Sequence, residues 1–281
     1  MIKNFQGKVV AITGAGSGIG RALAIRFAQA GCDLALSDIN YAAVEATKQM
    51  VNNDYDCNIS CHQLDVSDRK AFYAWANHVV AYHGKVNMII NNAGVALSGT
   101  VDSLSIEDYE WIMDINVWGV IYGTKAFLPY LEQSGEGHIV NISSIFGLTS
   151  QPLMSGYNTS KFAVRGFTES LRQDLALTNS CVSATCVHPG GIKTNIAQAA
   201  RVSDSVAEAT GKDSKAATKD FEMTFITTPE KAADTIFHAV KNDKRRVLVG
   251  PDAKVYDWVV RLMPTGYQKI MTAAVKLRSN K

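Results

Sequence analysis

The chain has 281 residues, of which 47% are hydrophobic and 19% are charged, and its formal net charge is +2. A chain of this size and composition can bury a large core, and open α/β sheets often reach this length without dividing, so a single domain is expected. The charge is close to neutral, and basic residues do not gather along a face with aromatic residues between them. These features argue against a nucleic-acid partner.

The five cysteines do not have the paired spacing of zinc sites, so reduced thiols and no metal site are expected. The first residues contain no long apolar segment of the kind found in secretory signals, and no uncharged run is apolar enough to span a bilayer. The expectation is a cytoplasmic protein with no integral membrane segment.

Segments with strand character alternate with segments of helix character along most of the chain. Strands are predicted at 8–13, 33–37, 58–64, 87–90, 138–142, 183–187 and 247–249. Helices are predicted at 18–30, 42–53, 69–83, 106–133, 155–177 and 229–240. The runs at 9–12 and 88–90 are continuously apolar, which is typical of central strands covered on both faces. The pattern predicts an α/β fold, a doubly wound parallel sheet of about seven strands with helices on both faces.

Two segments late in the chain lie outside this alternation. The stretch 197–219, inside a predicted substrate loop at 195–226, is rich in Ala, Ser, Lys and Asp, which predicts a mobile loop or weak helices. Residues 1–250 would form the main domain, and 251–281 a helical tail interrupted by Pro264 and Gly266. The tail presents apolar residues at helical spacing: Val255, Trp258, Val259, Leu262 and Met263. They require cover, either from the domain itself or from another subunit of a homodimer or homotetramer; peripheral membrane attachment is a third possibility.

A glycine-rich turn joins the first predicted strand to the first helix, in the order T-G-x-x-x-G-x-G from residue 13. Backbone N–H groups there can approach a pyrophosphate, and the helix N-terminus favours its negative charge. The candidate contacts are Gly14, Ser17, Gly18, Ile19 and Gly20. Asp38 ends the second strand, where a carboxylate would accept hydrogen bonds from the ribose hydroxyls and repel a 2′-phosphate. No Lys or Arg occupies positions 15, 17, 39 or 40, and Arg21 is expected on a solvated helix face. NAD is therefore predicted in preference to NADP.

A candidate reacting centre follows the strand predicted at 138–142. Tyr157 and Lys161 are four residues apart in a predicted helix, so their side chains share one face. An ammonium group nearby stabilises a phenolate, which would lower the pKa of Tyr157 and make it a better base. Ser144 ends the strand thirteen residues earlier and can orient a substrate oxygen, whereas Ser143 should face the other way.

These motifs, in this order, resemble the short-chain dehydrogenase/reductase family, a family of single-domain Rossmann-type enzymes. The resemblance spans residues 13 to 194 and matches Asn116, Ser144, Tyr157 and Lys161 to the family's catalytic set. It implies that Tyr157 is the general acid/base, and that Asn116 and Lys161 relay the proton through water. It also implies further cofactor contacts: Asp65 and Val66 beside the adenine, Asn92, Ala93 and Gly94 along the cleft, and Pro189, Gly190, Ile192 and Thr194 toward the nicotinamide.

Two departures from the family pattern are visible, Asn87 in place of a frequent Asp and larger residues at 158–160. Neither removes a reacting group. The expected activity is hydride transfer between NAD(H) and the carbon of a small-molecule alcohol or ketone, and the apolar segments that would line the pocket favour a hydrophobic one. Two alternatives remain: an NADPH-dependent ketone reductase, or a non-catalytic dinucleotide-binding protein, whose mark would be a broken Ser/Tyr/Lys set.

Overall fold

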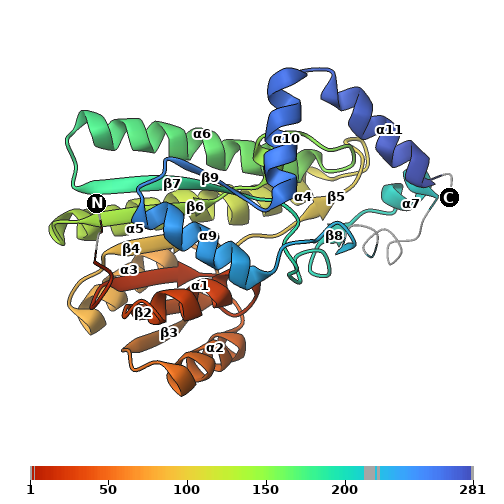
Figure 1. Cartoon of the computed structure of the whole chain (residues 1–281). Helices are drawn as coiled ribbons and strands as arrows, with labels where there is room; N and C mark the ends of the chain where they lie inside the picture. The colour runs from red at the N-terminus through yellow and green to blue at the C-terminus, as the bar shows by residue number, and fades with distance from the viewer. Residues whose placement is uncertain (1, 3, 212–218, 220–221, 280–281) are drawn as a thin grey trace.

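The apolar strands predicted from the sequence assemble into one parallel sheet in the computed structural model (Figure 1). The model describes residues 2, 4–211, 219 and 222–279, with the side chains of 278 and 279 left out. The seven strands lie in the order β3-β2-β1-β4-β6-β7-β9. They are β1 (Val9–Thr13), β2 (Asp33–Asp38), β3 (Ile59–Gln63), β4 (Met88–Asn91), β6 (Gly137–Ile142), β7 (Val182–Pro189) and β9 (Arg246–Val249). Every neighbouring pair in this sheet is parallel, which confirms the predicted doubly wound sheet.

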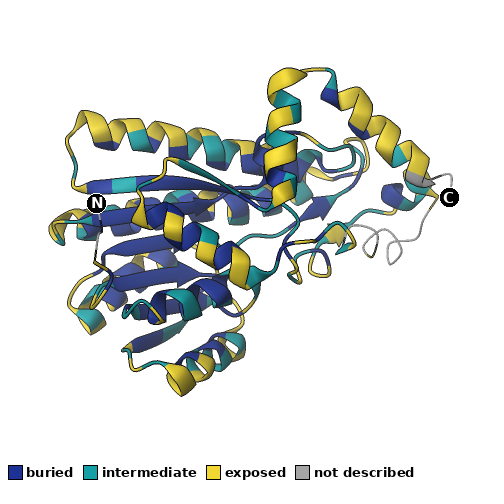
Figure 2. Ribbon diagram, viewed as in Figure 1, coloured by how far each residue is buried: buried dark blue, intermediate teal, exposed yellow. Residues whose placement is uncertain are grey.

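Helices cover both faces of the sheet, and β1 shows how its side chains divide between them. Val10 and Ile12 point into a cluster formed with α1 (Gly18–Ala28), α2 (Tyr41–Asp54) and α9 (Pro229–Lys241). Val9 and Ala11 point the opposite way, toward α3 (Arg69–His83), α5 (Gly119–Gln133) and α6 (Ser155–Leu177). Successive strand residues face opposite sides, so a continuous apolar run supplies both layers. Figure 2 shows the strands buried between the two helical layers.

The strand order reverses between β1 and β4. The chain runs outward from β1 through β2 to β3, then returns to place β4 on the other side of β1. The two carboxyl ends therefore lie side by side, with their connections leaving in opposite directions. In open α/β sheets this is the position of the ligand-binding crevice.

The helix predicted at 106–133 is divided into three pieces. It contains α4 (Ile106–Met113), the π-helical turn η1 (Asp114–Trp118) and α5. Ser105 begins α4 with a capping box that it forms with Asp108. Asn116 lies in the π turn, where its side chain bonds to the backbone of Val95. A π turn inserts one residue into the helix and commonly marks a functional position, and periodicity alone does not reveal it.

The stretch predicted as a mobile loop or weak helices contains two short elements. Its β8 (Arg201–Val202) pairs in parallel with β5 (Leu97–Ser98), and α7 (Ser205–Thr210) follows. Residues 212–218, also part of that prediction, lie outside the described residues.

The tail forms two helices, α10 (Pro251–Leu262) and α11 (Tyr267–Ser279), separated where Pro264 and Gly266 were expected to interrupt it. Both helices contact their own domain through hydrogen bonds: Arg246 donates to Asp257 of α10, and Tyr267 of α11 accepts from the backbone of Ser150. No helix in the described part of the chain is long and apolar enough to cross a membrane.

Candidate active site

A cavity of about 590 Å³ lies at the carboxyl edge of the sheet, beside the β1 and β4 ends. Nearly all of the predicted site residues line it. They are Gly14, Ser17, Gly18, Ile19, Asp38, Asp65, Val66, Asn92, Ala93, Gly94, Ser144, Tyr157, Lys161, Pro189, Gly190, Ile192 and Thr194. Gly20 and Asn116 do not line the cavity, and their contacts show that they support it from behind.

The glycine-rich turn has no room for side chains at three positions. Gly14 and Gly18 have φ angles of 62° and 51°, a region that residues with a Cβ rarely adopt. A Cβ on Gly20 would collide with the carbonyl oxygen of Gly14, and one on Gly18 would lie 2.9 Å from the Cγ2 of Thr194. Gly20 thus lets the first turn of α1 pack against the glycine loop, which explains why it belongs to the motif without bordering the cavity.

Thr13 and Asn92 join the ends of β1 and β4. The Thr13 hydroxyl accepts hydrogen bonds from the backbone N–H groups of Asn92 and Ala93, each at 3.0 Å. The Asn92 amide donates in return to the carbonyl oxygens of Thr13, at 2.9 Å, and Gly14, at 3.1 Å. These bonds fix the glycine turn against the β4 loop. Thr13 begins the motif in the sequence, but its structural role was not predicted.

Asp38 reaches the glycine turn from the end of β2. One carboxylate oxygen accepts from the N–H of Gly16 and the other from the N–H of Asn40, both at 3.0 Å. The expectation that Arg21 lies on a solvated helix face is wrong. Its guanidinium is partly buried, donating to the carbonyl oxygen of Gly16 and, at 3.1 Å, to the hydroxyl of Thr47. Arg21 therefore connects the turn to α2, and Arg21 and Asp38 both hydrogen-bond to the backbone of Gly16.

Ser144, Tyr157 and Lys161 meet at the other end of the cavity, as the sequence predicts. Ser144 borders this space, and so does Ser143, although Ser143 was expected to face the other way. The Ser143 hydroxyl is already engaged, because it donates to the carbonyl oxygen of Lys161 at 2.8 Å. The Lys161 ammonium donates to the carbonyl oxygen of Ile142 at 3.1 Å and lies 5.6 Å from the centre of the Tyr157 ring.

Burial is the largest influence on the pKa values of Tyr157 and Lys161, the two groups expected to take part in proton transfer. It raises the pKa of Tyr157 to about 12, against a smaller lowering by the hydrogen bond with Ser144. It also lowers the pKa of Lys161 to about 8. Lys161 alone does not produce the expected lowering of the Tyr157 pKa, because desolvation of the buried phenolate is the larger effect; the expectation also included the positive charge of a nicotinamide ring.

The buried side chain of Asn116 connects the segment after β4 to α6 through hydrogen bonds. Its amide oxygen accepts from the N–H of Val95 at 2.9 Å, and its nitrogen donates at 3.0 Å to both the carbonyl oxygen of Val95 and the hydroxyl of Ser160. A Cβ on Gly94 would lie 3.1 Å from the Asn116 oxygen and 3.3 Å from the Lys161 nitrogen. Asn116 therefore positions the cavity wall between β4 and α6, close to Lys161.

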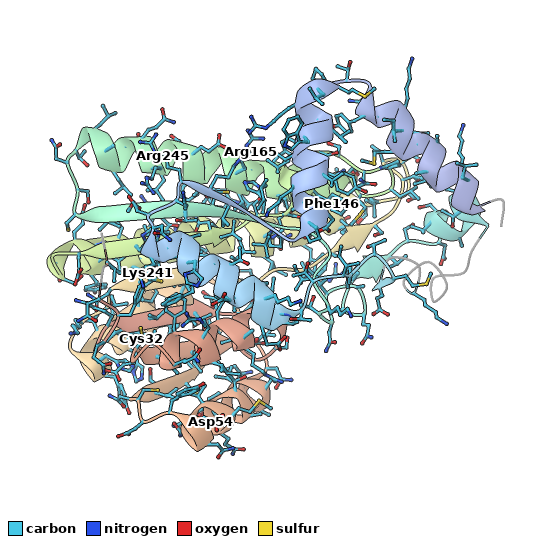
Figure 3. All side chains as sticks on the ribbon, in the orientation of Figure 1. Cys32, Asp54, Phe146, Arg165, Lys241 and Arg245 are labelled. Atoms are coloured by element: carbon cyan, nitrogen blue, oxygen red, sulfur yellow. The ribbon has the colours of Figure 1, made fainter. Side chains whose placement is uncertain are left out.

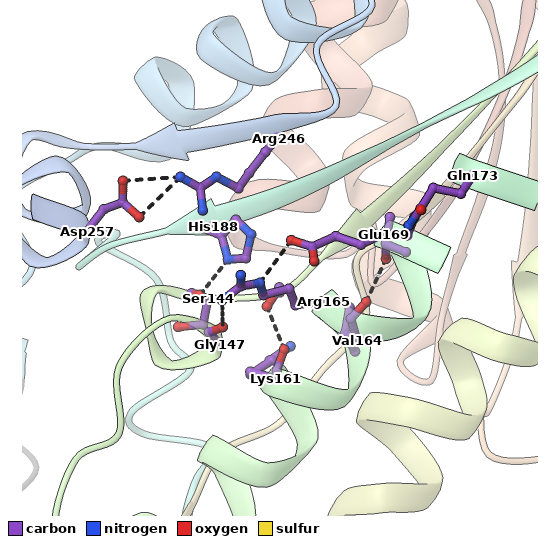
Figure 4. A network of polar contacts seen from close by, with 12 residues as sticks. Ser144, Gly147, Lys161, Val164, Arg165, Glu169, Gln173, His188, Arg246 and Asp257 are labelled. Carbon is purple, nitrogen blue, oxygen red and sulfur yellow. Dashed lines mark hydrogen bonds and ion pairs between the residues drawn. The ribbon is translucent and has the colours of Figure 1, made fainter. Parts of the chain in front are cut away.

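His188 lies behind Ser144 and was not predicted as a site residue (Figure 4). Its Nδ1–H donates to the carbonyl oxygen of Ser144 at 2.9 Å, and its Nε2 has no hydrogen-bond partner among the described residues. The pKa of His188 is lowered to about 4, mainly by burial and to a smaller extent by the charges of Arg246 and Arg165, against the opposing effect of the hydrogen bond to Ser144; the imidazole is therefore neutral at pH 7. A histidine directly before Pro189 was the available signal, but a lone histidine in a strand more often belongs to the core.

The two departures from the family pattern both make structural hydrogen bonds. Asn87 accepts from the backbone N–H of Val9 at 3.1 Å and donates to Ser134 at 3.3 Å, which supports the pairing of β1 with β4. Asn158 donates to the carbonyl oxygen of Gln151 at 2.9 Å. Neither substitution disturbs the cavity.

The cavity beyond Ser144 and Tyr157 is mostly apolar. Its lining there includes Val95, Ala96, Ile145, Phe146, Met154, Ile196, Ala199, Phe225 and Tyr256, and the polar residues Gln151, Asn195, Thr224 and Asp252. Phe146, labelled in Figure 3, packs with Ala253 of α10. Tyr256 and Asp252 belong to the tail, which no sequence motif connected with the site. In the part of the chain that the structure describes, no group of three or more His, Cys, Asp or Glu side chains could hold a metal ion.

Comparison with known proteins gives one consistent family. Residues 8–204 match the model of the short chain dehydrogenase family. The chain is 45% identical to the "Putative oxidoreductase SadH" of Mycobacterium tuberculosis over 275 residues, covering 98% of this chain and 97% of that one. It is 33% identical to dehydrogenase/reductase SDR family member 7B of Xenopus laevis, covering 98% and 84% of the two chains.

Solved structures agree with this assignment. A short chain dehydrogenase/reductase from Burkholderia phymatum in complex with NAD superposes with a TM-score of 0.84 at 30% identity, covering 94% of this chain and 96% of that one. A short chain dehydrogenase from Mycobacterium paratuberculosis bound to NAD gives a TM-score of 0.75 at 26% identity, covering 88% and 97%. The chain belongs to the short-chain dehydrogenase/reductase family and is an oxidoreductase of that type.

Proposed function

We propose that this protein is an NAD-dependent dehydrogenase that interconverts a hydrophobic secondary alcohol and its ketone. The proposal rests on one observation: the cavity described above is lined by two sets of groups that the reaction needs. At one end lie the glycine turn and the carboxylate of Asp38, which suits a ribose, and at the other end lie Ser144, Tyr157 and Lys161 beside an apolar wall. Two solved relatives of the same fold hold NAD, which supports the choice of cofactor.

The residues at the glycine turn fit a dinucleotide. The glycine positions of the turn leave no room for a Cβ atom, and the turn leads into α1, so its backbone N–H groups and the helix N-terminus favour a pyrophosphate. Ser17 precedes α1 without making a capping hydrogen bond and lines the cavity, which leaves its hydroxyl for a phosphate oxygen. Asp38 would accept from the ribose, Asp65 and Val66 would flank the adenine, and Ile192 and Thr194 would contact the nicotinamide carboxamide. When bound there, the cofactor would supply the hydride acceptor for alcohol oxidation and, in its reduced form, the hydride donor for ketone reduction.

The proton steps fall to this chain's own side chains. In ketone reduction the Tyr157 hydroxyl donates its proton to the substrate oxygen while the Ser144 hydroxyl holds that oxygen. Oxidation runs the other way and needs the phenolate, which the nearby ammonium of Lys161 stabilises. Lys161 borders the cavity, so it can also contact the cofactor ribose. Asn116 does not border the cavity, because its side chain bonds to the backbone of Val95 behind the cavity wall.

Replacing the phenol tests the reacting centre. Tyr157→Phe should retain NADH binding, because the ring and the helix remain, but should lose turnover by at least about a hundredfold, since no other group can move the proton. NADH titration by fluorescence and steady-state rates with an established substrate measure the two effects. Tyr82→Phe, at a half-exposed position outside the cavity, is the matched control. Full turnover by Tyr157→Phe with normal NADH binding would show that this assignment is wrong.

The rate of alcohol oxidation should rise with pH. Burial raises the pKa of Tyr157 to about 12, so at neutral pH the residue is a phenol and only a small fraction is the base that oxidation needs. That fraction grows about tenfold for each pH unit below the pKa. Ketone reduction uses the phenol and should not rise. Initial rates in both directions from about pH 6 to about pH 10 give the comparison, and a pH-independent kcat/KM for oxidation would contradict it.

Cofactor preference should depend on the charge of Asp38. Asp38→Asn keeps an acceptor for the Gly16 N–H but removes the repulsion of a 2′-phosphate, so it should narrow the preference for NADH over NADPH by about tenfold or more. Competitive titration of both cofactors against parent and variant measures the ratio. Tighter binding of NADPH than of NADH by the parent protein would favour an NADPH-dependent reductase instead, with Arg21, which bonds to the carbonyl oxygen of Gly16, as the available cation.

His188 should act as a positioning residue for Ser144. His188→Leu removes the bond to the Ser144 carbonyl, and we expect kcat to fall by up to about tenfold, the value of one net hydrogen bond. The KM for NAD should not change. His188→Asn places an amide donor near the lost Nδ1 and should recover most of kcat. If the His188→Leu and His188→Asn variants had equal kcat values, or if they differed from the parent protein only in thermal stability, His188 would have a purely structural role.

A further inference from the structure

The tail helices α10 and α11 are largely exposed (Figure 2), and many of their exposed side chains are apolar. Of the eighteen large apolar or aromatic side chains exposed among the described residues, six lie between residues 255 and 277. They are Val255, Trp258, Leu262, Met263, Ile270 and Leu277. Trp258 is 66% exposed and Leu262 is 70% exposed, so their positions are not explained by packing on the domain.

The domain holds both helices in a fixed position with these residues outward. Asp257, on the inner side of α10, accepts two hydrogen bonds from Arg246 at 3.1 Å and one from Arg261 at 2.9 Å. On α11 the buried Tyr267 and Met271 contact the loop at Ser150 and Gln151. The outward faces are therefore presented by anchored helices.

The same helices carry the positive charge of the protein. Residues 251–279 contain five of the 28 Lys and Arg residues but two of the 26 Asp and Glu residues, which leaves 23 basic against 24 acidic residues elsewhere. Both acids are engaged inward: Asp257 with the two arginines, and Asp252 with the backbone N–H of Gly191 at 2.6 Å. Lys254 and Lys269 are exposed directly beside Val255 and Ile270.

We propose that α10 and α11 form a docking surface for an anionic lipid bilayer. Exposed apolar side chains flanked by lysines, with a tryptophan among them, are the composition of helices that lie in a membrane interface. A second copy of the chain fits less well, because pairing two such faces would bring lysines together while no outward acid on these helices could balance them. Tyr256 of α10 lines the cavity, so docking would place the cavity wall close to lipid. The proposal does not depend on which cofactor or substrate the cavity takes.

Vesicle binding tests the surface with the full chain. We expect at least about tenfold stronger partitioning into vesicles of phosphatidylcholine with phosphatidylglycerol than into phosphatidylcholine alone, and a loss of that difference when salt rises from about 0.1 M to about 0.5 M. Co-sedimentation measures the partitioning. The Trp118→Phe variant keeps Trp258, so its tryptophan emission should shift to shorter wavelength when anionic vesicles are added. The Trp258→Phe variant lacks the tryptophan of the docking surface and should show no such shift.

Paired variants separate the apolar and the charged contributions. Trp258→Gln with Leu262→Gln should lose binding to both vesicle types at least tenfold, and Lys254→Gln with Lys269→Gln should lose only the preference for anionic lipid. Leu177→Gln, at an equally exposed leucine of α6, should bind like the parent. The proposal is wrong if the parent protein binds neither vesicle or the Trp258/Leu262 variant binds undiminished. It is equally wrong if that variant instead separates a dimer into monomers, since a second copy then covers the helices.

Discussion

The architecture of the site depends on the close approach of two strand ends, β1 and β4. They are neighbours in the sheet although they are far apart in the sequence, because the strand order reverses here: β2 and β3 lie on one side of β1, and β4 lies on the other. The reciprocal bonds of Thr13 and Asn92 hold the ends together, and the turn packs against Asn92 only because Gly14 and Gly20 have no Cβ atoms. Everything that faces the cavity, from Asp38 to Lys161, is placed relative to this junction.

A second constraint acts on the reacting centre, where burial and charge oppose one another. Burial favours the neutral forms of both groups: it keeps Tyr157 a phenol, because it raises the pKa of its hydroxyl, and it lowers the pKa of the Lys161 ammonium. The hydrogen bond from Lys161 to the Ile142 carbonyl fixes the position of the Lys161 nitrogen. A positive charge close to Tyr157 opposes the effect of burial on the phenol, because it stabilises the phenolate.

The sequence predicts most of the sheet and most of the cavity wall because both are local patterns. Continuous apolar runs identify central strands, and the glycine turn, Asp38 and the Tyr157/Lys161 pair have fixed spacings. What it misses depends on contacts distant in the chain: the π turn at Asn116, the bond from His188 to Ser144, and the inward role of Arg21. The balance of pKa values at Tyr157 also escapes it, since burial is a property of the assembled fold.

The tail completes the site. Asp252 at the start of α10 accepts from the N–H of Gly191, directly after the Pro189–Gly190 turn, and a Cβ on Gly190 would collide with the same carboxylate. The part of the cavity beside Pro189 and Gly190 is thus shaped by a residue that begins the tail, and Tyr256 one turn later adds to the cavity wall. Arg246 of β9 bonds to Asp257 on the same helix and so fixes α10 against the sheet. The helix therefore has two distinct sides: Asp252 and Tyr256 border the cavity, whereas Trp258 and Leu262 are exposed.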